Sequence, residues 1–207
     1  MTYLLRLVAC LFLCISLNSF GALLGFDDVD APSTGASFFS ASGPFIFEDN
    51  SIYNQPSRGG IRIANGSNSP TSYYNYMMSS PDNFAFVSSS SIISMTLASG
   101  GRFNFTSAKF GRSHIPSLNN FLGFRDGEIV FQVNFMSNWV SENIALHYQE
   151  FNWNNVDRID FWSEHYVNGS SVIDDITYTV NPVPIPAGIT LFLSGLVGLG
   201  LMRGRDA

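Results

Sequence analysis

Residues 124–135 read Phe-Arg-Asp-Gly-Glu-Ile-Val-Phe-Gln-Val-Asn-Phe. Apolar residues occupy every second position of the later part, at Ile129, Phe131, Val133 and Phe135. Because successive side chains of a β-strand point to opposite faces, this alternation predicts a strand with one buried face. The Arg-Asp-Gly sequence directly before it is a turn signal. A turn followed by a half-buried strand is the unit from which antiparallel sheets are built.

The same alternation recurs along the central region. Phe103 and Phe105 are separated by a polar residue, as are Ile159 and Phe161. Further strands are expected at Phe45–Phe47, Gly60–Ala64, Phe84–Val87, Ile92–Leu97 and Ile144–Glu150. Turn signals separate the strands at 65–67, 99–101, 125–127 and 168–170. Many short strands in this length predict an all-β fold, a jelly-roll β-sandwich that spans residues 23–180.

Composition limits the partners of this domain. The chain has 10 basic and 16 acidic residues, and Lys109 is its one lysine. Without Arg6, Arg203, Arg205 and Asp206 near the ends, the central region keeps 7 basic and 15 acidic residues, a net charge of −8. An acidic surface repels phosphate backbones, so we expect no nucleic-acid partner. It suits solubility, a divalent cation or neutral sugars.

The N-terminus has the form of a secretory signal. Residues 4–17 are an apolar run that carries only Arg6, and small and polar residues follow it. This order predicts a signal peptide over residues 1–22, with cleavage after Gly21 or Ala22. The alternative is a membrane anchor that stays attached, but the run is shorter than the ~20 residues that a span needs.

Both cysteines, Cys10 and Cys14, lie inside that apolar run. Leu7-Val8-Ala9-Cys10 looks like a lipoprotein acylation box, although the apolar run continues well past it. If the signal is removed, the mature protein has no cysteine. We then expect no disulfide, no thiol nucleophile and no thiolate metal site.

The C-terminus has the form of an anchor. Ala187 to Met202 is uncharged, and Arg203 and Arg205 follow it. A helix of this length is ~24 Å long, a little short of a ~30 Å hydrocarbon core. Basic residues after a span stay cytoplasmic, which places the preceding domain outside. The alternative, a buried core helix, lacks the expected amphipathic pattern.

This tail closely resembles the PEP-CTERM sorting signal in its Val-Pro-x-Pro form. The resemblance rests on Val183-Pro184-Ile185-Pro186, the apolar helix expected at 187–202, and the basic end. It implies a sorting tail over residues 181–207 in a Gram-negative, often exopolysaccharide-producing bacterium. It also implies an exosortase that recognises the tail at the inner membrane. The processed protein would then reach the cell surface or the extracellular matrix.

The central region resembles PEP-CTERM ectodomains with a carbohydrate-binding-module-like jelly roll. The shared elements are Phe26-Asp27-Asp28, residues 103–108, residues 124–127 with the strand after them, residues 153–161 and residues 172–178. The resemblance implies a non-catalytic domain with glycan association, and a structural calcium ion between the first and last strands.

The residues themselves make an acidic site plausible there. Asp27 and Asp28 lie at the start of the domain, and Asp174 and Asp175 lie in its last predicted strand. First and last strands of a jelly roll usually lie near each other, and carboxylates from two strands suit Ca²⁺. Strict alternation points Asp174 inward with Val172, Ile176 and Tyr178, so its carboxylate needs a partner. The alternative is that these aspartates cap strand ends or face solvent.

Aromatic residues are the candidates for sugar contact, because their rings offer flat apolar area. Tyr73, Tyr74 and Tyr76 lie in a polar loop, and Trp162 alternates away from Ile159 and Phe161. Core packing is the alternative for each of them.

No catalytic set emerges from the sequence. It contains no zinc-protease, nucleophile-elbow or phosphate-loop motif, and no glutamates that can be paired. We expect a non-catalytic surface or matrix protein with weak glycan or exopolysaccharide association. The alternatives are a secreted carbohydrate-active hydrolase and a purely structural coat protein.

Overall fold

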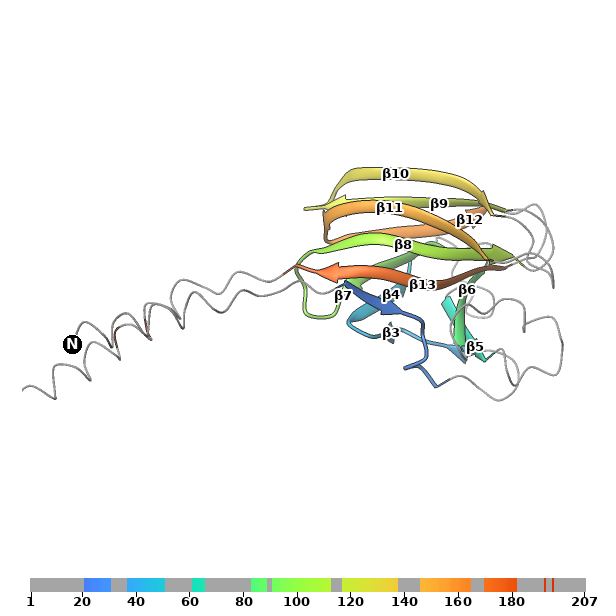
Figure 1. Ribbon diagram of the computed structural model, residues 1–207, viewed down its shortest axis with the longest axis horizontal. Helices are drawn as coiled ribbons and strands as arrows, with labels where there is room; N and C mark the ends of the chain where they lie inside the picture. The colour runs from blue at the N-terminus through green and yellow to red at the C-terminus, as the bar shows by residue number, and fades with distance from the viewer. Residues whose placement is uncertain are drawn as a thin grey trace, which may run out of the picture.

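The protein is an all-β sandwich, as predicted (Figure 1). A computed structural model describes residues 21–30, 37–50, 61–65, 83–88, 91–112, 117–137, 146–164 and 170–181, with Phe192 and Gly195. Within these ranges thirteen strands form two antiparallel sheets. The two sheets enclose one hydrophobic core.

Sheet A holds seven strands. Its order is β11 (His147–Val156), β8 (Phe103–Arg112), β13 (Ser170–Val180), β6 (Asn83–Ser88), β5 (Ile61–Asn65) and β2 (Ser37–Phe38). The remaining strand, β1 (Gly21–Leu24), pairs with β13. Sheet B holds six strands, in the order β10 (Glu128–Ser137), β9 (Ser117–Arg125), β12 (Arg158–Glu164), β7 (Ile93–Leu97), β4 (Phe45–Asp49) and β3 (Ala41–Ser42).

The strands β6 to β13 have jelly-roll connectivity. Four of them lie in the order β11-β8-β13-β6 and four in the order β10-β9-β12-β7, so the chain repeatedly crosses between the sheets. The first and last strands are neighbours, as expected, because Gly21 pairs with Thr179 and Leu24 with Ile176. The two ends of the domain therefore meet at one end of the sandwich (Figure 1).

Phenylalanine rings fill the core. The largest fully buried side chains of the core between the sheets include Phe26, Phe45, Phe103, Phe105 and Phe121. The alternation read at Phe103 and Phe105, and at Ile159 and Phe161, is confirmed, since all four side chains are buried. The high phenylalanine content is thus explained by packing between the sheets.

The predicted turn at 125–127 connects β9 to β10. Arg125 pairs with Glu128, so Asp126 and Gly127 alone form the loop. Their φ angles are 53° and 82°, the left-handed values that a two-residue type I′ turn requires at both positions. Aspartate followed by glycine is among the sequences that adopt this turn most readily.

Two expectations about shared faces are wrong. Ile129 does not share the inner face with Phe131, because the β10–β9 register shifts between them and Ile129 stays 55% exposed. Val172 does not share the inner face with Ile176. The inner cluster contains Ile173, Ile176 and Tyr178, and the β13–β8 pairing is irregular between Asp174 and Thr177. Bulges of this kind change which face a strand buries.

The predicted signal peptide and sorting tail fall largely outside the described residues. Gly21 and Ala22, where cleavage is predicted, belong to β1. In the predicted tail helix, Phe192 and Gly195 are described and are helical. No helix in the described portion is long and apolar enough to cross a membrane.

Candidate functional site

The outer face of sheet B carries the one predicted sugar-contacting residue that the structure describes. On β12, Ile159, Phe161 and Ser163 point inward and are buried. Their neighbours Asp160, Trp162 and Glu164 therefore point to the outer face. Its alternation predicted this outward direction, and Trp162 is half-buried there.

Amide and acidic side chains lie beside Trp162, with Leu118 and Leu122 of β9 diagonal to it on the same face. Asn120 of β9 pairs in register with Trp162, and Asn134 of β10 pairs with Asn120, so the three lie in one row across the sheet. The Asn120 Nδ2 donates to Glu164 Oε1 at 3.2 Å. We call the surface formed by Asn120, Asn134, Trp162 and Glu164 the Trp162 face.

A hydrogen-bonded network holds the sheet beside this face. Asn50 Nδ2 donates to Ser94 Oγ at 2.5 Å, and Ser94 Oγ donates to Asp160 Oδ1 at 2.6 Å. Arg158 Nε lies 3.0 Å from the same Asp160 oxygen, and its guanidinium lies 3.8 Å from the ring centre of Phe124. Asp160 is therefore committed to neighbouring side chains.

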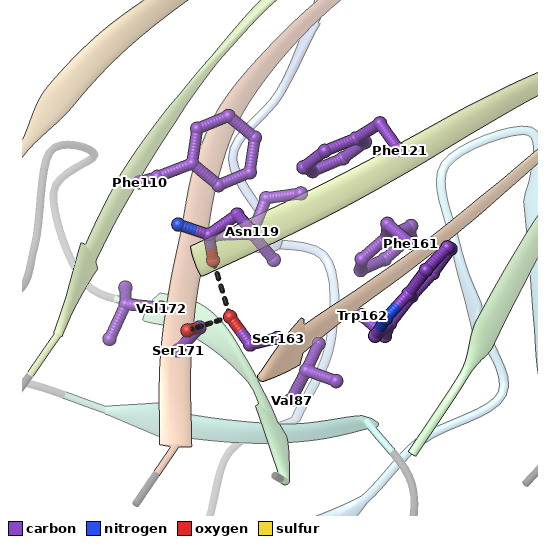
Figure 2. Close-up of a pocket in the computed structure, with 10 residues that line it drawn as sticks. Val87, Phe110, Asn119, Phe121, Phe161, Trp162, Ser163, Ser171 and Val172 are labelled. Atoms are coloured by element: carbon purple, nitrogen blue, oxygen red, sulfur yellow. Dashed lines mark hydrogen bonds between the residues drawn. The ribbon is translucent and has the colours of Figure 1, made fainter. Parts of the chain in front are cut away.

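Behind the Trp162 face lies a buried polar bridge between the sheets. Ser163 Oγ donates to Asn119 Oδ1 within sheet B and lies 2.5 Å from Ser171 Oγ of sheet A (Figure 2). Because Ser163 has one proton, Ser171 donates to it. The cavity beside the bridge has a volume of about 10 Å³, room for one water molecule. This bridge positions the end of β12 rather than a ligand.

The Trp162 face suits binding better than acid–base catalysis. Asp160 and Glu164 are its nearest carboxylates along β12, and four residues of strand separate them by ~13 Å. A glycosidase pair lies ~5–9.5 Å apart. A flat indole among amides instead offers stacking area with hydrogen-bonding groups at its rim.

The predicted aspartates at the start of the domain bond to two different elements. Asp27 Oδ1 accepts from the backbone N–H of Asn83 on β6 at 3.0 Å. Asp28 accepts from Ser42 Oγ and from the Gly43 N–H, each at 2.5 Å. Burial raises the pKa of Tyr178, and the negative charge of Asp28 raises it further. Both carboxylates anchor the segment after β1.

The aspartates of β13 also have protein partners. Asp174 is fully buried, as predicted, but Ile173 points to the inner cluster, so Asp174 points to the other side of sheet A. Asp174 Oδ1 accepts from the N–H of Asp175 at 2.8 Å, and Asp175 Oδ2 lies 3.0 Å from Lys109 Nζ. A lysine ammonium there competes with a cation. Among the described residues, no three histidine, cysteine or acidic side chains are grouped to hold a metal.

The calcium site thus stays a prediction, and Asp28 offers its test. We expect Asp28→Ala to lower the free energy of unfolding by about 2 kcal/mol, because hydrogen bonds to a charged group are lost while Ser42 stays buried. The loss should be equal in calcium and in chelator, measured by urea unfolding. A calcium-dependent stability that Asp28→Ala abolishes would instead support the predicted metal site.

The remaining predicted residues divide into two groups. Tyr73, Tyr74 and Tyr76 lie outside the described residues, as do the sorting residues Val183, Pro184, Pro186, Arg203 and Arg205.

The sequence did not indicate the Asn120–Asn134 row or the Ser163 bridge. Period-2 alternation places Asn120 and Asn134 outward, but only the pairing of β9 with both β10 and β12 aligns them with Trp162.

Comparison with known proteins finds similarity at the level of structure. No protein-family model matches the chain, and no curated protein matches it. A DUF4465 family protein from Bacteroides caccae is similar with a TM-score of 0.49 and 10% identity, over 78% of this chain and all of that one. TmCBM61 in complex with β-1,4-galactotriose is similar with a TM-score of 0.39 and 9% identity, over 67% and 90%.

A cleaved adhesin domain of Lys-gingipain is similar with a TM-score of 0.42 and 9% identity, over 78% of this chain and 98% of that one. These similarities do not assign a function to this chain.

Proposed function

We propose that this chain is an exported, non-catalytic surface or matrix protein that binds neutral glycan weakly through the Trp162 face. The observation that carries the proposal is the position of Trp162, outward from sheet B and in one row with Asn120 and Asn134. An indole stacks on the apolar face of a sugar ring, while amides can both donate to and accept from hydroxyl groups.

Charge and shape narrow the ligand class. The outer face of sheet B carries three acidic residues, Glu48, Asp160 and Glu164, and one basic residue, Arg158. Its negative charge therefore disfavours binding of anionic polymers. The cavity behind it admits only a water molecule, whereas small-molecule sites are concave and far larger. A sheet face with a half-buried aromatic ring fits an extended polysaccharide, held weakly at each site.

The ends of the chain support export and sorting. Residues 1–22 and 181–207 have the patterns of a signal peptide and an exosortase-processed tail. Both terminal segments join the domain at the same end, since Gly21 pairs with Thr179. That geometry suits a domain tethered at one end while its tail sits in the inner membrane. Mass spectrometry of the protein isolated from the organism that makes it tests whether both segments are removed. Intact termini on the protein at the cell surface would contradict the proposed export and sorting.

The glycan proposal is tested by affinity electrophoresis in gels that contain neutral polysaccharides, including exopolysaccharide from the host. We expect Trp162→Ala to weaken retention at least about tenfold, because the stacking surface is lost. Tyr148→Ala is the matched control, since Tyr148 is an exposed aromatic on sheet A. The control should leave retention unchanged.

Two outcomes would reject the proposal. Equal retention of the wild type and Trp162→Ala would show that the Trp162 face is not the binding surface. Release of new reducing ends from the same polysaccharides by the purified wild type would favour the hydrolase instead.

A further inference from the structure

The two sheets have five edge strands among the described elements, and four of them are protected. Exposed edges present unpaired backbone groups that can pair with another chain, so proteins shorten, bend or charge them. β2 and β3 are two residues long each, and β1, which pairs only with β13, has four residues. β11 is interrupted by two register shifts, with Asn152 and Asn155 at φ angles of 53° and 62°.

The fifth edge, β10, has one register shift, between Ile129 and Phe131, and lacks these protections beyond it. It has ten residues, and its pairing with β9 is continuous from Phe131 to Ser137. Its one charged residue, Glu128, lies at its first position, and it contains no proline or lysine. Three of its apolar side chains are exposed, with Ile129 at 55%, Val130 at 38% and Met136 at 53%.

The sequence of β10 is nearly symmetric about Val133. Phenylalanine stands two residues to each side, at Phe131 and Phe135. An amide side chain stands one residue to each side, at Gln132 and Asn134. A strand that reads alike in both directions is self-complementary when two copies run antiparallel, as a twofold interface requires.

We propose that β10 pairs antiparallel with β10 of a second copy of this chain, about a twofold axis through Val133. This register places Phe131 opposite Phe135 of the second copy on the inner face. It places Gln132 opposite Asn134 on the outer face. Directly opposed aromatic pairs and paired polar side chains stabilise antiparallel strands.

The same register covers two of the three exposed apolar residues of the edge, Val130 and Met136. Val130 lies opposite Met136 of the second copy, so two exposed side chains are buried against each other. The two copies of Glu128 lie at opposite ends of the interface, ~30 Å apart, where salt screens their repulsion. Each chain has a net charge of −6, so an edge almost free of charge is where a second copy approaches at least cost.

The pairing joins the two B sheets into one continuous sheet. Because the axis is perpendicular to the sheet, both Trp162 faces point to the same side. Two weak sites in one plane would bind a polysaccharide more tightly than one. A single strand pair is a small interface, so we expect a reversible dimer rather than an obligate one.

Analytical ultracentrifugation of the full chain in detergent tests the proposal. We expect the wild type to shift from monomer to dimer as its concentration rises. Gln132→Lys combined with Asn134→Lys places like charges directly opposite at two points and should abolish the dimer. Gln132→Lys combined with Asn134→Glu places opposite charges there and should retain it. Both variants keep the apolar ends of the chain unchanged.

Amide hydrogen exchange of the wild type gives a readout that needs no variant. Protection of Phe131–Ser137 should rise with concentration, because outward amides of β10 gain partners in the dimer. A wild type that stays monomeric, or equal dimerisation of the two double variants, would overturn the proposal. Neither result depends on glycan binding.

Discussion

Replacing Phe121 with alanine is expected to lower the free energy of unfolding by about 3–5 kcal/mol, enough to unfold much of a marginally stable domain. Phe121 is 2% exposed and lies at the centre of the aromatic core. Its ring centre lies 5.0–6.5 Å from those of Phe105, Phe110, Phe135, Phe151 and Phe161. These neighbours come from both sheets, so the cavity would open where the layers meet.

The change is measured by equilibrium urea unfolding at a fixed temperature. Ile129→Ala is the control, because Ile129 is an apolar residue that is largely exposed on β10. We expect the control to change the free energy of unfolding by less than about 0.5 kcal/mol. A loss below about 1 kcal/mol for Phe121→Ala would mean that the sheets do not pack around this ring.

Local patterns predicted the fold where each strand is regular. The alternation around Ile159 was sufficient because β12 pairs with β7 and with β9 without a register shift. Phe103 and Phe105 are both buried as well, although the pairing of β8 with β11 shifts register between them. The Asp126-Gly127 turn was also predictable, since its φ angles depend on those two residues alone. The burial of Asp174 was predicted correctly. The side chain nevertheless points to the opposite face of sheet A from the one predicted, because of the bulge beside it.

What sequence could not predict depends on pairing between distant strands. The strand predicted at Ile144–Glu150 continues to Val156, because Asn152 and Asn155 adopt left-handed angles that let β11 follow β8. The local sequence around each residue also did not predict the Ser163 bridge. Asn119, Ser163 and Ser171 are ordinary polar residues until the two sheets bring them together.

The second large effect is expected from Gly123, where the core leaves no room for a side chain. Gly123 pairs with Phe131 on one side and Ile159 on the other. A Cβ atom there would lie 2.9 Å from Trp153 Cε3 and 3.2 Å from Phe131 Cβ. We expect Gly123→Ala to lower the free energy of unfolding by about 2–3 kcal/mol, measured by urea unfolding.

The cause of that loss is specific, because Trp153 stacks on Phe131 with ring centres 5.4 Å apart and planes 7° apart. Trp153→Leu alone should also destabilise the protein, since it removes a buried ring. In the double variant, however, the smaller leucine leaves space for the new methyl group. The combined loss should therefore fall short of the sum of the single losses by at least about 1 kcal/mol. Additive losses would place the strain of Gly123→Ala in the backbone of β9, and Trp153 would not be the group that excludes a side chain at position 123.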